Sequence, residues 1–414
     1  MTLPASGALT VSGIRTELGA SGQINLGGAG ARGLSGIASG AIRLSDFHGK
    51  SNAPSGGLWL WGANWGGQLG DNTIVSKSSP IQTVCGGTNW SQVASGGGGT
   101  TAAIKTDGTL WVCGYNTTGQ LGDNTRVHKS SPIQTVAGGT NWKQVSSGGA
   151  GNTAAIKTDG TLWLWGYDGY GVLGDNSTAN KSSPIQTVAG GTNWKVVALG
   201  SGGQTAAAIK TDGTLWLWGR GDMGQLGDNT VVNKSSPVQT VAGGTDWSQV
   251  SLGQSSSAAI KTDGTLWTWG YNVYGQLGDN TVVRRSSPVQ TVAGGTNWKQ
   301  VAAGFNHIAA IKTDGTLWVC GYNNRGQLGI NSIVNKSSPV QTVCGGTNWS
   351  QVSAGRDHTA AIKTDGTLWL WGRGIDGQLG DNTVVNRSSP IQTVAGGTNW
   401  KVVACSNYET LALR

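Results

Sequence analysis

Two short apolar runs joined by Asp-Gly recur along most of this chain. The copy at residues 101–114 reads Thr-Ala-Ala-Ile-Lys-Thr-Asp-Gly-Thr-Leu-Trp-Val-Cys-Gly, and similar copies start at residues 153, 206, 257, 308 and 359. Both residues of an Asp-Gly pair tolerate positive φ, so each copy is predicted to form a β-hairpin. The second run, Leu-Trp-x-Trp-Gly with Cys for the second Trp in two copies, occurs seven times at intervals of 51 to 53 residues. A unit repeated at such a period predicts a solenoid or a propeller.

One full unit contains four predicted strands. In the unit that begins at Trp298 they cover residues 298–302, 308–312, 317–321 and 339–343, and we term them strands A, B, C and D. Strand C is apolar at successive positions, so both of its faces should be buried. A strand buried on both faces fits a sheet that is stacked between two other sheets, and radially arranged four-stranded blades provide that environment.

The two ends of the repeat array are incomplete in complementary ways. The first unit, which begins at Leu58, has only strands C and D, whereas the last unit, from Trp400 to Arg414, has only strands A and B. A linear solenoid would carry polar caps instead. The sequence therefore predicts an all-β fold, a seven-bladed β-propeller over residues 58–414 that is closed by a composite blade from both termini.

Residues 1–50 do not share this repeat. Ser-Gly followed by alternating apolar and polar residues occurs at residues 6–12, 21–27 and 39–45, which predicts a short extended segment. With so few apolar side chains it cannot form a core alone, so it should order by adding strands to a partner. A flexible tail is the alternative. Residues 51–57, Ser-Asn-Ala-Pro-Ser-Gly-Gly, form a linker.

Composition adds further limits. The net charge is +8, but the charges follow the repeat and no basic run exceeds Arg284-Arg285, so nucleic acid is not the expected partner. The five cysteines are an odd number without a Cys-x-x-Cys pair and replace Trp or Ala of other units, which indicates buried small side chains and no disulfide frame. No apolar stretch is long enough to span a membrane, and no secretory signal is evident, so folding in a reducing cytoplasm is expected.

No arrangement of residues indicates catalysis, a cofactor or a metal. A Ser/His/Asp set or a pair of carboxylates cannot be assembled from the repeats, and residues 96–99 lack the Lys-Ser/Thr of a phosphate-binding loop. Leu-Gly-Asp-Asn recurs in six units, with Ile330 replacing Asp in another, and is expected to form turns. A metal would require more oxygen ligands per site. We therefore expect a protein that is not an enzyme.

The loops of the two propeller faces differ in variability. The B–C turn is always Lys-Thr-Asp-Gly, and the D–A turn Gly-Gly-Thr-Asn-Trp changes only at Asp246. The A–B and C–D loops share the other face, vary between units, and carry all seven tyrosines. Aromatic and arginine side chains on variable loops are typical of binding surfaces. The predicted binding residues are Trp65, Tyr115, Tyr167, Tyr170, Arg220, Met223, Tyr271, Tyr274, Phe305, His307, Tyr322, Arg325, Arg356, His358, Arg373 and Tyr408.

Some of these residues have a structural alternative. Tyrosines that directly follow Trp-Gly or Cys-Gly could cover the neighbouring blade, and these are Tyr115, Tyr167, Tyr271 and Tyr322. His307 and His358 occupy equivalent positions in adjacent units and are expected to be structural rather than metal ligands or bases.

The repeats resemble the regulator-of-chromosome-condensation family of seven-bladed propellers. The resemblance is carried by Gly-x-x-His-Thr-Ala-Ala-Ile-Lys-Thr-Asp-Gly-Thr-Leu-Trp-x-Trp-Gly at residues 355–372 and Gly-Gln-Leu-Gly at 377–380, and it covers residues 58–414. Members of this family include a bacterial inhibitor of β-lactamases and a nucleotide-exchange factor that binds nucleosomes. The exchange factor depends on a wedge inserted in one blade, for which no unit here has room, so exchange activity is not implied.

Residues 13–19 and 39–51 resemble a leader found at the front of tailed-bacteriophage virion proteins, whereas residues 23–36 depart from it. This resemblance implies a virion structural protein of the tail-fibre or decoration type, made in the host cytoplasm and oligomeric in the particle. Residues 1–50 would bind other virion proteins, and the propeller would bind a host surface protein or glycan. The alternatives are a free bacterial propeller that binds or inhibits a protein, and a chromatin or DNA binder whose affinity would fall steeply with salt.

Overall fold

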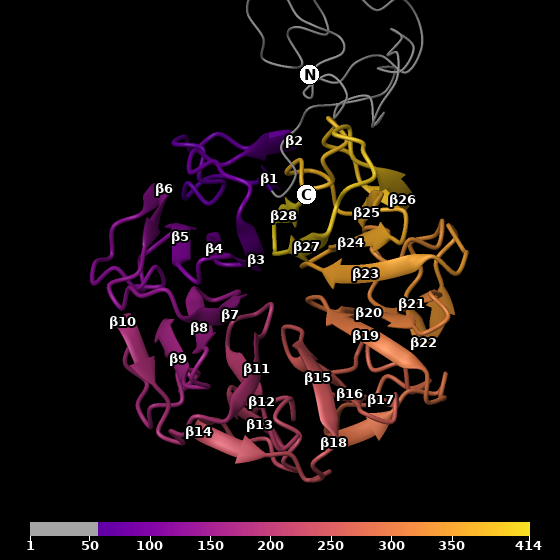
Figure 1. The fold of residues 1–414 in the computed structure, drawn as a ribbon. Helices are drawn as coiled ribbons and strands as arrows, with labels where there is room; N and C mark the ends of the chain where they lie inside the picture. The colour runs from indigo at the N-terminus through magenta and orange to yellow at the C-terminus, as the bar shows by residue number, and fades with distance from the viewer. Residues whose placement is uncertain (1–56) are drawn as a thin grey trace, which may run out of the picture. The chain divides into compact units, whose positions relative to one another are not determined.

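Seven antiparallel four-stranded sheets surround a central axis in the computed structural model, which describes residues 57–414 (Figure 1). The innermost strands are β3 (Trp90–Gly96), β7 (Trp142–Gly148), β11 (Trp194–Leu199), β15 (Trp247–Leu252), β19 (Trp298–Ala303), β23 (Trp349–Ala354) and β27 (Val402–Cys405). Next to them lie β4 (Thr100–Lys105), β8 (Asn152–Lys157), β12 (Thr205–Lys210), β16 (Ser256–Lys261), β20 (His307–Lys312), β24 (His358–Lys363) and β28 (Glu409–Leu413).

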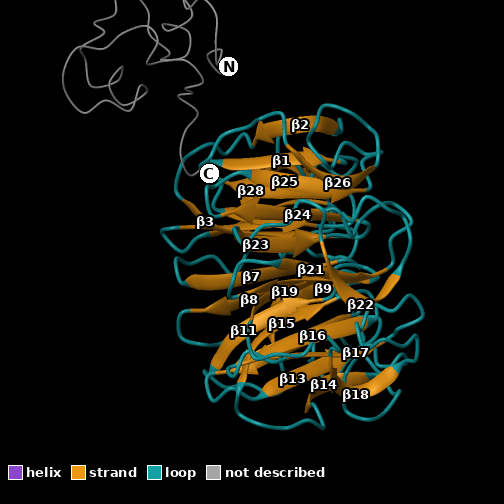
Figure 2. Ribbon diagram, turned by 90° about the vertical axis from the view of Figure 1, so that its right-hand side faces the viewer, coloured by secondary structure: helices purple, strands orange, loops and turns teal. Residues whose placement is uncertain are grey.

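The two outer layers complete each blade. The third strands are β1 (Leu58–Gly62), β5 (Leu110–Gly114), β9 (Leu162–Gly166), β13 (Leu215–Gly219), β17 (Leu266–Gly270), β21 (Leu317–Gly321) and β25 (Leu368–Gly372). The edge strands are β2 (Lys77–Gln82), β6 (Lys129–Gln134), β10 (Lys181–Gln186), β14 (Lys234–Gln239), β18 (Arg285–Gln290), β22 (Lys336–Gln341) and β26 (Arg387–Gln392). Viewed from the side, the described residues consist of strands and loops only, and they contain no helix that could cross a membrane (Figure 2). The predicted all-β propeller is confirmed.

Strand D begins earlier than predicted. The sequence pattern placed it at 339–343, whereas β22 covers Lys336–Gln341 and pairs with β21 across a register shift between Val319 and Gly321. The predicted strand began at Pro339, but a proline is tolerated within this strand because it lies at the sheet edge, where one side needs no backbone donor.

One blade is built from both ends of the chain, as predicted. Its strand order is β2-β1-β28-β27, and β1 pairs with β28 from Leu58 opposite Leu413 to Gly62 opposite Glu409. Figure 1 shows the first and last colours of the described chain side by side in this blade. Because β28 also pairs with β27, it is the strand through which the N-terminal and C-terminal halves of the blade are joined.

Neighbouring blades are joined through the Gly-Gln-Leu-Gly loop. The indole Nε1 of Trp165 donates to the carbonyl oxygen of Gln120 in the preceding blade at 2.8 Å, and the Thr153 hydroxyl donates to the same oxygen at 2.9 Å. Gly122 has a φ of 63°, and a Cβ there would lie 2.7 Å from the same indole nitrogen, so a side chain at this position would collide with the buried Trp. In two blades a buried cysteine replaces this Trp, and the Cys113 thiol donates to the Gln68 carbonyl at 3.6 Å.

The first Trp of strand C is only half-buried, which differs from the prediction that both faces of this strand are fully buried. It belongs to a cation stack at the B–C end of the blade. The Lys157 ammonium lies 4.8 Å from the Trp142 ring and 4.9 Å from the Trp163 ring, and Trp163 donates to the Thr161 hydroxyl. In the composite blade the guanidinium of Arg414 takes the place of the lysine. The lysine ammonium must remain in contact with water, so the first Trp, which lies beside it, stays partly exposed.

The cysteines form no disulfide. Cys113 and Cys320 are buried, as expected, whereas Cys85, Cys344 and Cys405 are half-buried. Cys405 is partly exposed because it lies on an innermost strand, which faces the axis of the propeller.

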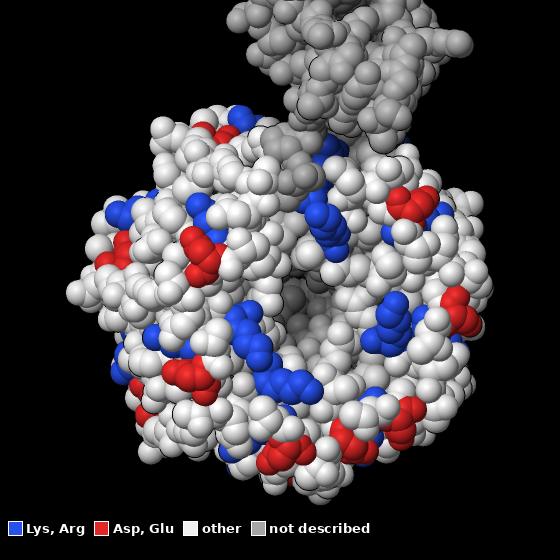
Figure 3. Space-filling view, viewed as in Figure 1, with Lys and Arg blue, Asp and Glu red and all other residues white. Residues whose placement is uncertain are grey.

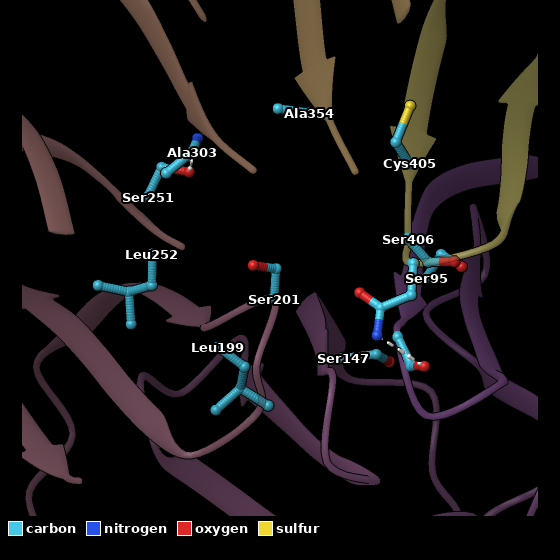
Figure 4. A pocket seen from close by; sticks show the side chains of 12 residues that line it. Ser95, Ser147, Leu199, Ser201, Ser251, Leu252, Ala303, Ala354, Cys405 and Ser406 are labelled. Atoms are coloured by element: carbon cyan, nitrogen blue, oxygen red, sulfur yellow. Dashed lines mark hydrogen bonds between the residues drawn. The ribbon is translucent and has the colours of Figure 1, made fainter. Parts of the chain in front are cut away.

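The axis of the propeller is hollow (Figure 3). A cavity of about 130 Å³ lies where the innermost strands converge, and most of its lining side chains are small, such as Ser147, Ser251 and Ala354 (Figure 4). Glutamines join these strands around the axis. The side chain of Gln144 donates to the Val197 carbonyl and accepts from the Val197 N–H, both at 3.1 Å.

We predict that removing residues 410–414 destabilises the whole propeller. This deletion removes most of β28, so β1 and β27 lose their common partner and the ring opens. The expected melting temperature falls on the order of 10 °C or more, measured by near-UV circular dichroism of the tryptophans. A chain with Lys401→Ala, an exposed residue that precedes β27, is the control and should melt like the wild type. An unchanged melting curve for the truncated chain would contradict closure through β28.

Candidate binding surface

The A–B and C–D loops lie on one face of the propeller, which we term the rim face. Its A–B loops are hydrogen-bonded to one another in succession. The N–H of Gln254 donates to the carbonyl of Phe305, the N–H of Phe305 donates to that of Gly355, and the N–H of Arg356 donates to that of Ser406. Each loop is therefore held by the next blade, and the side chains they carry have fixed positions around the axis.

A buried asparagine holds each of four C–D loops in shape. Asn272 is fully buried, its Oδ1 accepts from the Leu277 N–H at 2.9 Å, and its Nδ2 donates to Asp279 at 3.0 Å. Asn64, Asn116 and Asn323 have the same position in their units, and each accepts from the corresponding Leu N–H. These loops are built by internal hydrogen bonds, which leaves their outward side chains free for contact.

The Leu-Gly-Asp-Asn segments form turns, as expected. Asp279 accepts from the N–H and hydroxyl of Thr281, and it also forms an ion pair with Arg285 at 2.9 Å. Asn280 has a φ of 60°, and its N–H donates to the Ser337 carbonyl of the next blade. Among residues 57–414, no group of three or more His, Cys, Asp or Glu side chains is arranged to hold a metal ion.

Five of the predicted binding residues line one groove on the rim face. The groove has a volume of about 360 Å³, and Arg220, Met223, Tyr271, Tyr274 and Phe305 contribute to its wall. The ring centroids of Tyr271 and Tyr274 are 6.2 Å apart, and Tyr274 lies 4.5 Å from Tyr322 of the next blade. The groove therefore combines apolar aromatic faces with hydroxyl groups at a junction between blades.

Arg220 is fixed at the edge of this groove. Its guanidinium forms two hydrogen bonds with the carboxylate of Asp222, at 2.8 and 2.9 Å, and a third with the side chain of Gln204 at 2.8 Å. It also lies 5.7 Å from the centroid of Tyr170. Such a bidentate pair holds the guanidinium plane in one orientation.

A second group of predicted residues forms a stack of alternating aromatic and cationic side chains. The Arg356 guanidinium lies 4.9 Å from the Phe305 ring and 5.5 Å from the Tyr408 ring, and it donates to the Tyr408 hydroxyl. Arg373 lies on Tyr408 at 5.2 Å, and Trp65 is 5.6 Å from the same ring. The stack and the groove share Phe305, so together they form one continuous surface, which we term the aromatic rim.

Acidic groups neutralise part of this stack. Asp357 lies within 4.0 Å of both Arg356 and Arg373, and Arg373 also pairs with Asp376 at 2.9 Å. Burial raises the pKa of Asp357 despite these arginines.

Of the predicted binding residues, Trp65 and Arg325 have exposed side chains, and Trp65 is 53% exposed. The others are half-buried or buried.

The prediction that His307 and His358 contact a ligand is not compatible with their burial. Both side chains are 0% exposed, and their Nε2 atoms lie 2.9 Å from the Thr359 hydroxyl and 3.0 Å from the Thr410 hydroxyl. They begin β20 and β24, so they point into the sheet beneath the loops. Burial lowers the pKa of His307 to about 4 and that of His358 to about 3, which keeps both rings neutral. Their position agrees with the structural role that the sequence also indicated.

The tyrosines after Trp-Gly or Cys-Gly divide between two environments. Tyr115 packs on Gly66 of the preceding blade and lies 4.8 Å from His128, and Tyr167 packs over Gly169 of its own loop. Tyr271 and Tyr322, by contrast, belong to the aromatic rim. Tyr115 therefore covers the neighbouring blade, as the structural alternative expects, whereas Tyr167 covers its own loop.

Sequence reasoning missed several polar residues of the groove. Gln254, Ser255 and Asn306 line it from the A–B loops of two blades. Arg284, which the sequence marked only as part of a basic pair, donates to the Asp222 carbonyl beside the groove. The signal available was the variability of the A–B loop, but polar side chains there are common and do not stand out as aromatic ones do.

The chain belongs to the family of the RCC1-like domain, whose family model matches residues 57–412. It is 30% identical over 336 residues to the ultraviolet-B receptor UVR8 of Arabidopsis thaliana, covering 80% of this chain and 76% of the receptor. It is also 30% identical to the mitochondrial RCC1 domain-containing protein RUG3 of the same plant, covering 67% of this chain and 64% of that protein. The human E3 ubiquitin-protein ligase HERC2 is 27% identical, but the chain spans only 8% of its length.

Solved structures show the same fold. Human WBSCR16 superimposes with a TM-score of 0.75 at 22% identity, covering 86% of this chain and 98% of that one. Prp20p of Saccharomyces cerevisiae superimposes with a TM-score of 0.73 at 18% identity, covering 87% and 92%. The family assignment confirms the resemblance of residues 58–414 that the repeats indicated. The resemblance of residues 1–50 to virion proteins lies outside the described residues.

One C–D loop of the rim face contains a buried carboxyl group in place of the asparagine. Asp168 is 0% exposed, accepts from the Leu173 N–H at 2.8 Å, and lacks the amide with which Asn116 donates to Asp123. Burial, together with the nearby Asp175 carboxylate, raises the pKa of Asp168 to about 7. The folded state therefore favours the neutral form of Asp168.

We predict that Asp168→Asn raises stability at pH 8. Because the folded pKa lies above the unfolded value, the stabilisation is complete at acidic pH and is lost as pH rises through about 7. The amide cannot ionise and restores the missing donor. The melting temperature of the variant should exceed that of the wild type at pH 8 and depend less on pH between about 5 and 8. Glu409, whose pKa burial also raises to about 7, leaves a residual dependence. Equal melting temperatures at pH 8 would contradict the assignment.

Proposed function

We propose that this chain is a non-enzymatic protein-binding propeller and that the aromatic rim holds its partner. The observation that carries this proposal is the continuous surface formed by the groove and the Phe305–Arg356–Tyr408 stack. Aromatic and arginine side chains supply most of the binding energy in protein interfaces. Here they are already stacked and hydrogen-bonded, so less conformational entropy is lost when a partner binds.

The relatives support a protein partner. The structure of Prp20p is described together with its binding to Gsp1p and histones, and another structure contains it bound to Kap60. HERC2 is a ligase of which an RCC1-like propeller of this size is only a small part. These names support a regulatory binding module for this chain.

The histidine and arginine side chains at the rim are held by internal contacts. The two histidines nearest to the aromatic rim are neutral and buried against threonine hydroxyls. Arginines on the rim are engaged with carboxylates and aromatic rings, which suits recognition.

Panning a random-peptide display library on the immobilised propeller tests the rim. We expect enriched peptides to bind the wild type and to lose binding about tenfold or more to Tyr274→Ala combined with Phe305→Ala, since each truncates a central aromatic contact. The control combines Val84→Ala with Val136→Ala, which truncates exposed apolar side chains near the D–A turns of the opposite face. Peptides that bind both variants as tightly as the wild type would overturn the rim as the binding surface.

A second hypothesis rests on residues 1–50 and their resemblance to virion leaders. In that case the segment docks to other virion proteins, and the aromatic rim binds a host surface protein or glycan. The relatives named above are not virion proteins, so the protein-binding module is the better-supported proposal.

Deleting residues 1–50 tests the virion hypothesis. The expected product is a soluble folded propeller, verified by near-UV circular dichroism, that is absent from purified particles while the full chain is incorporated. Incorporation of the truncated chain at the full-chain level would contradict a docking role for residues 1–50.

A further inference from the structure

Most lysines of residues 57–414 are neutralised or stacked within their own blade. Six of them lie between two tryptophan rings, namely Lys105, Lys157, Lys210, Lys261, Lys312 and Lys363. Four others at the start of the edge strands lie 3.1 to 3.8 Å from an aspartate, namely Lys77, Lys129, Lys181 and Lys234. Lys336 belongs to the unit in which Ile330 replaces that aspartate.

The four remaining lysines occupy one equivalent position. Lys143, Lys195 and Lys299 are the second residues of the innermost strands β7, β11 and β19, and Lys401 immediately precedes β27. All four are exposed, and the ion pairs found among residues 57–414 do not include them. We term them the lysine ring.

The lysine ring surrounds the axial hollow on the face opposite the aromatic rim. Figure 3 shows basic side chains bordering the hollow, whereas the acidic side chains lie farther out on the same face. Among those acids are the aspartates of the B–C turns, such as Asp159, which accepts from the N–H and hydroxyl of Thr161. Charges of one sign around a hollow in a low-dielectric body focus the potential at its mouth, so the ring attracts a negative group.

Residues 1–56 do not supply that group. Residues 1–56 contain the cations Arg15, Arg32, Arg43 and Lys50 but only the acids Glu17 and Asp46. Their net charge is therefore positive, and they cannot neutralise the ring. The charge of the ring therefore favours an acidic segment of another molecule as its occupant.

We propose that the lysine ring binds an acidic peptide segment of a partner protein, which inserts its carboxylates at the axial hollow. A nucleic acid is a poorer fit, because a phosphate backbone needs cations along a track and here the outer part of the face presents aspartates. The tryptophans of this face are stacked with their own lysines, so they are not available to bases. A narrow acidic segment reaches the ring at the axis without crossing the outer aspartates.

Serine is the natural residue at the lysine position in the other blades, so it is the substitution to use in a test. The remaining three innermost strands have serine at the lysine position, and the Ser91, Ser248 and Ser350 hydroxyls donate to backbone carbonyls of the adjacent strand at 2.9 to 3.0 Å. Serine is therefore compatible with the fold at this position. The quadruple variant Lys143→Ser, Lys195→Ser, Lys299→Ser and Lys401→Ser removes the ring without creating a cavity.

The probe is a fluorescein-labelled octaglutamate peptide, and fluorescence anisotropy of the full chain at low ionic strength is the measurement. We expect the quadruple variant to bind about tenfold or more weakly than the wild type, and the triple variant Ser91→Lys, Ser248→Lys and Ser350→Lys to bind more tightly. A control that removes the same charge elsewhere combines Lys77→Ser, Arg126→Ser, Lys234→Ser and Lys336→Ser, none of which belongs to the lysine ring or to the aromatic rim. Its affinity should stay close to that of the wild type.

Three outcomes would overturn the proposal. The control could lose as much affinity as the ring variant, which would show attraction by net charge alone. The ring variant could keep wild-type affinity. An octathymidylate oligonucleotide could bind the ring more tightly than octaglutamate, which would favour nucleic acid. The Tyr274→Ala and Phe305→Ala variant should bind octaglutamate like the wild type, so failure of this proposal and failure of the rim proposal are distinguishable.

Discussion

Closure of the ring by β28 is the constraint on which the rest of the molecule depends. Each blade buries its faces only against two neighbours, so an open array would expose one blade face at each end. Trp61, for example, would lose the Gln378 carbonyl to which its indole now donates. Residues 409–413 pair with β1 on one side and β27 on the other. Across the blade boundary, the Thr410 hydroxyl donates to the Gln378 carbonyl and accepts from His358. The hydrogen bonds of one short strand therefore hold the composite blade together. The first and the last complete blades of the chain, which begin at β3 and β23, bury their free faces against it.

The same inter-blade contacts determine how rigid the two faces are. The Gln carbonyl of each Gly-Gln-Leu-Gly loop accepts from groups of the next blade, as Gln120 does from Trp165 and Thr153, and the A–B loops are hydrogen-bonded in series around the axis. Because the backbone of these loops is held by hydrogen bonds, their side chains can vary without changing the conformation of the loop. A repeat that is nearly invariant in its interior can thus differ from blade to blade only where partners would be met.

The two faces differ in physical character. The rim face collects aromatic rings and arginines whose charges are balanced by carboxylates such as Asp357 and Asp222, so its contacts are expected to be dominated by buried area and stacking. The opposite face carries unbalanced lysines around the axis, whose contribution is long-range and sensitive to salt. A partner could engage both faces only by wrapping around the propeller, so the two surfaces are suited to two different molecules or to two segments of one.

The sequence by itself determined the strands, their order and the composite blade. Asp-Gly turns and alternating apolar runs act locally, and the missing halves of the first and last units leave one way to complete a sheet. The pairing of Trp65 with Tyr408, the burial of His307 and His358, and the stacking of Arg356 between Phe305 and Tyr408 were decided only by the tertiary structure. The stacked residues are about fifty positions or more apart and meet because neighbouring blades are related by a rotation about the axis. The lysine ring was hidden for the same reason, since four identical residues at one strand position become a single charged surface only when the innermost strands converge.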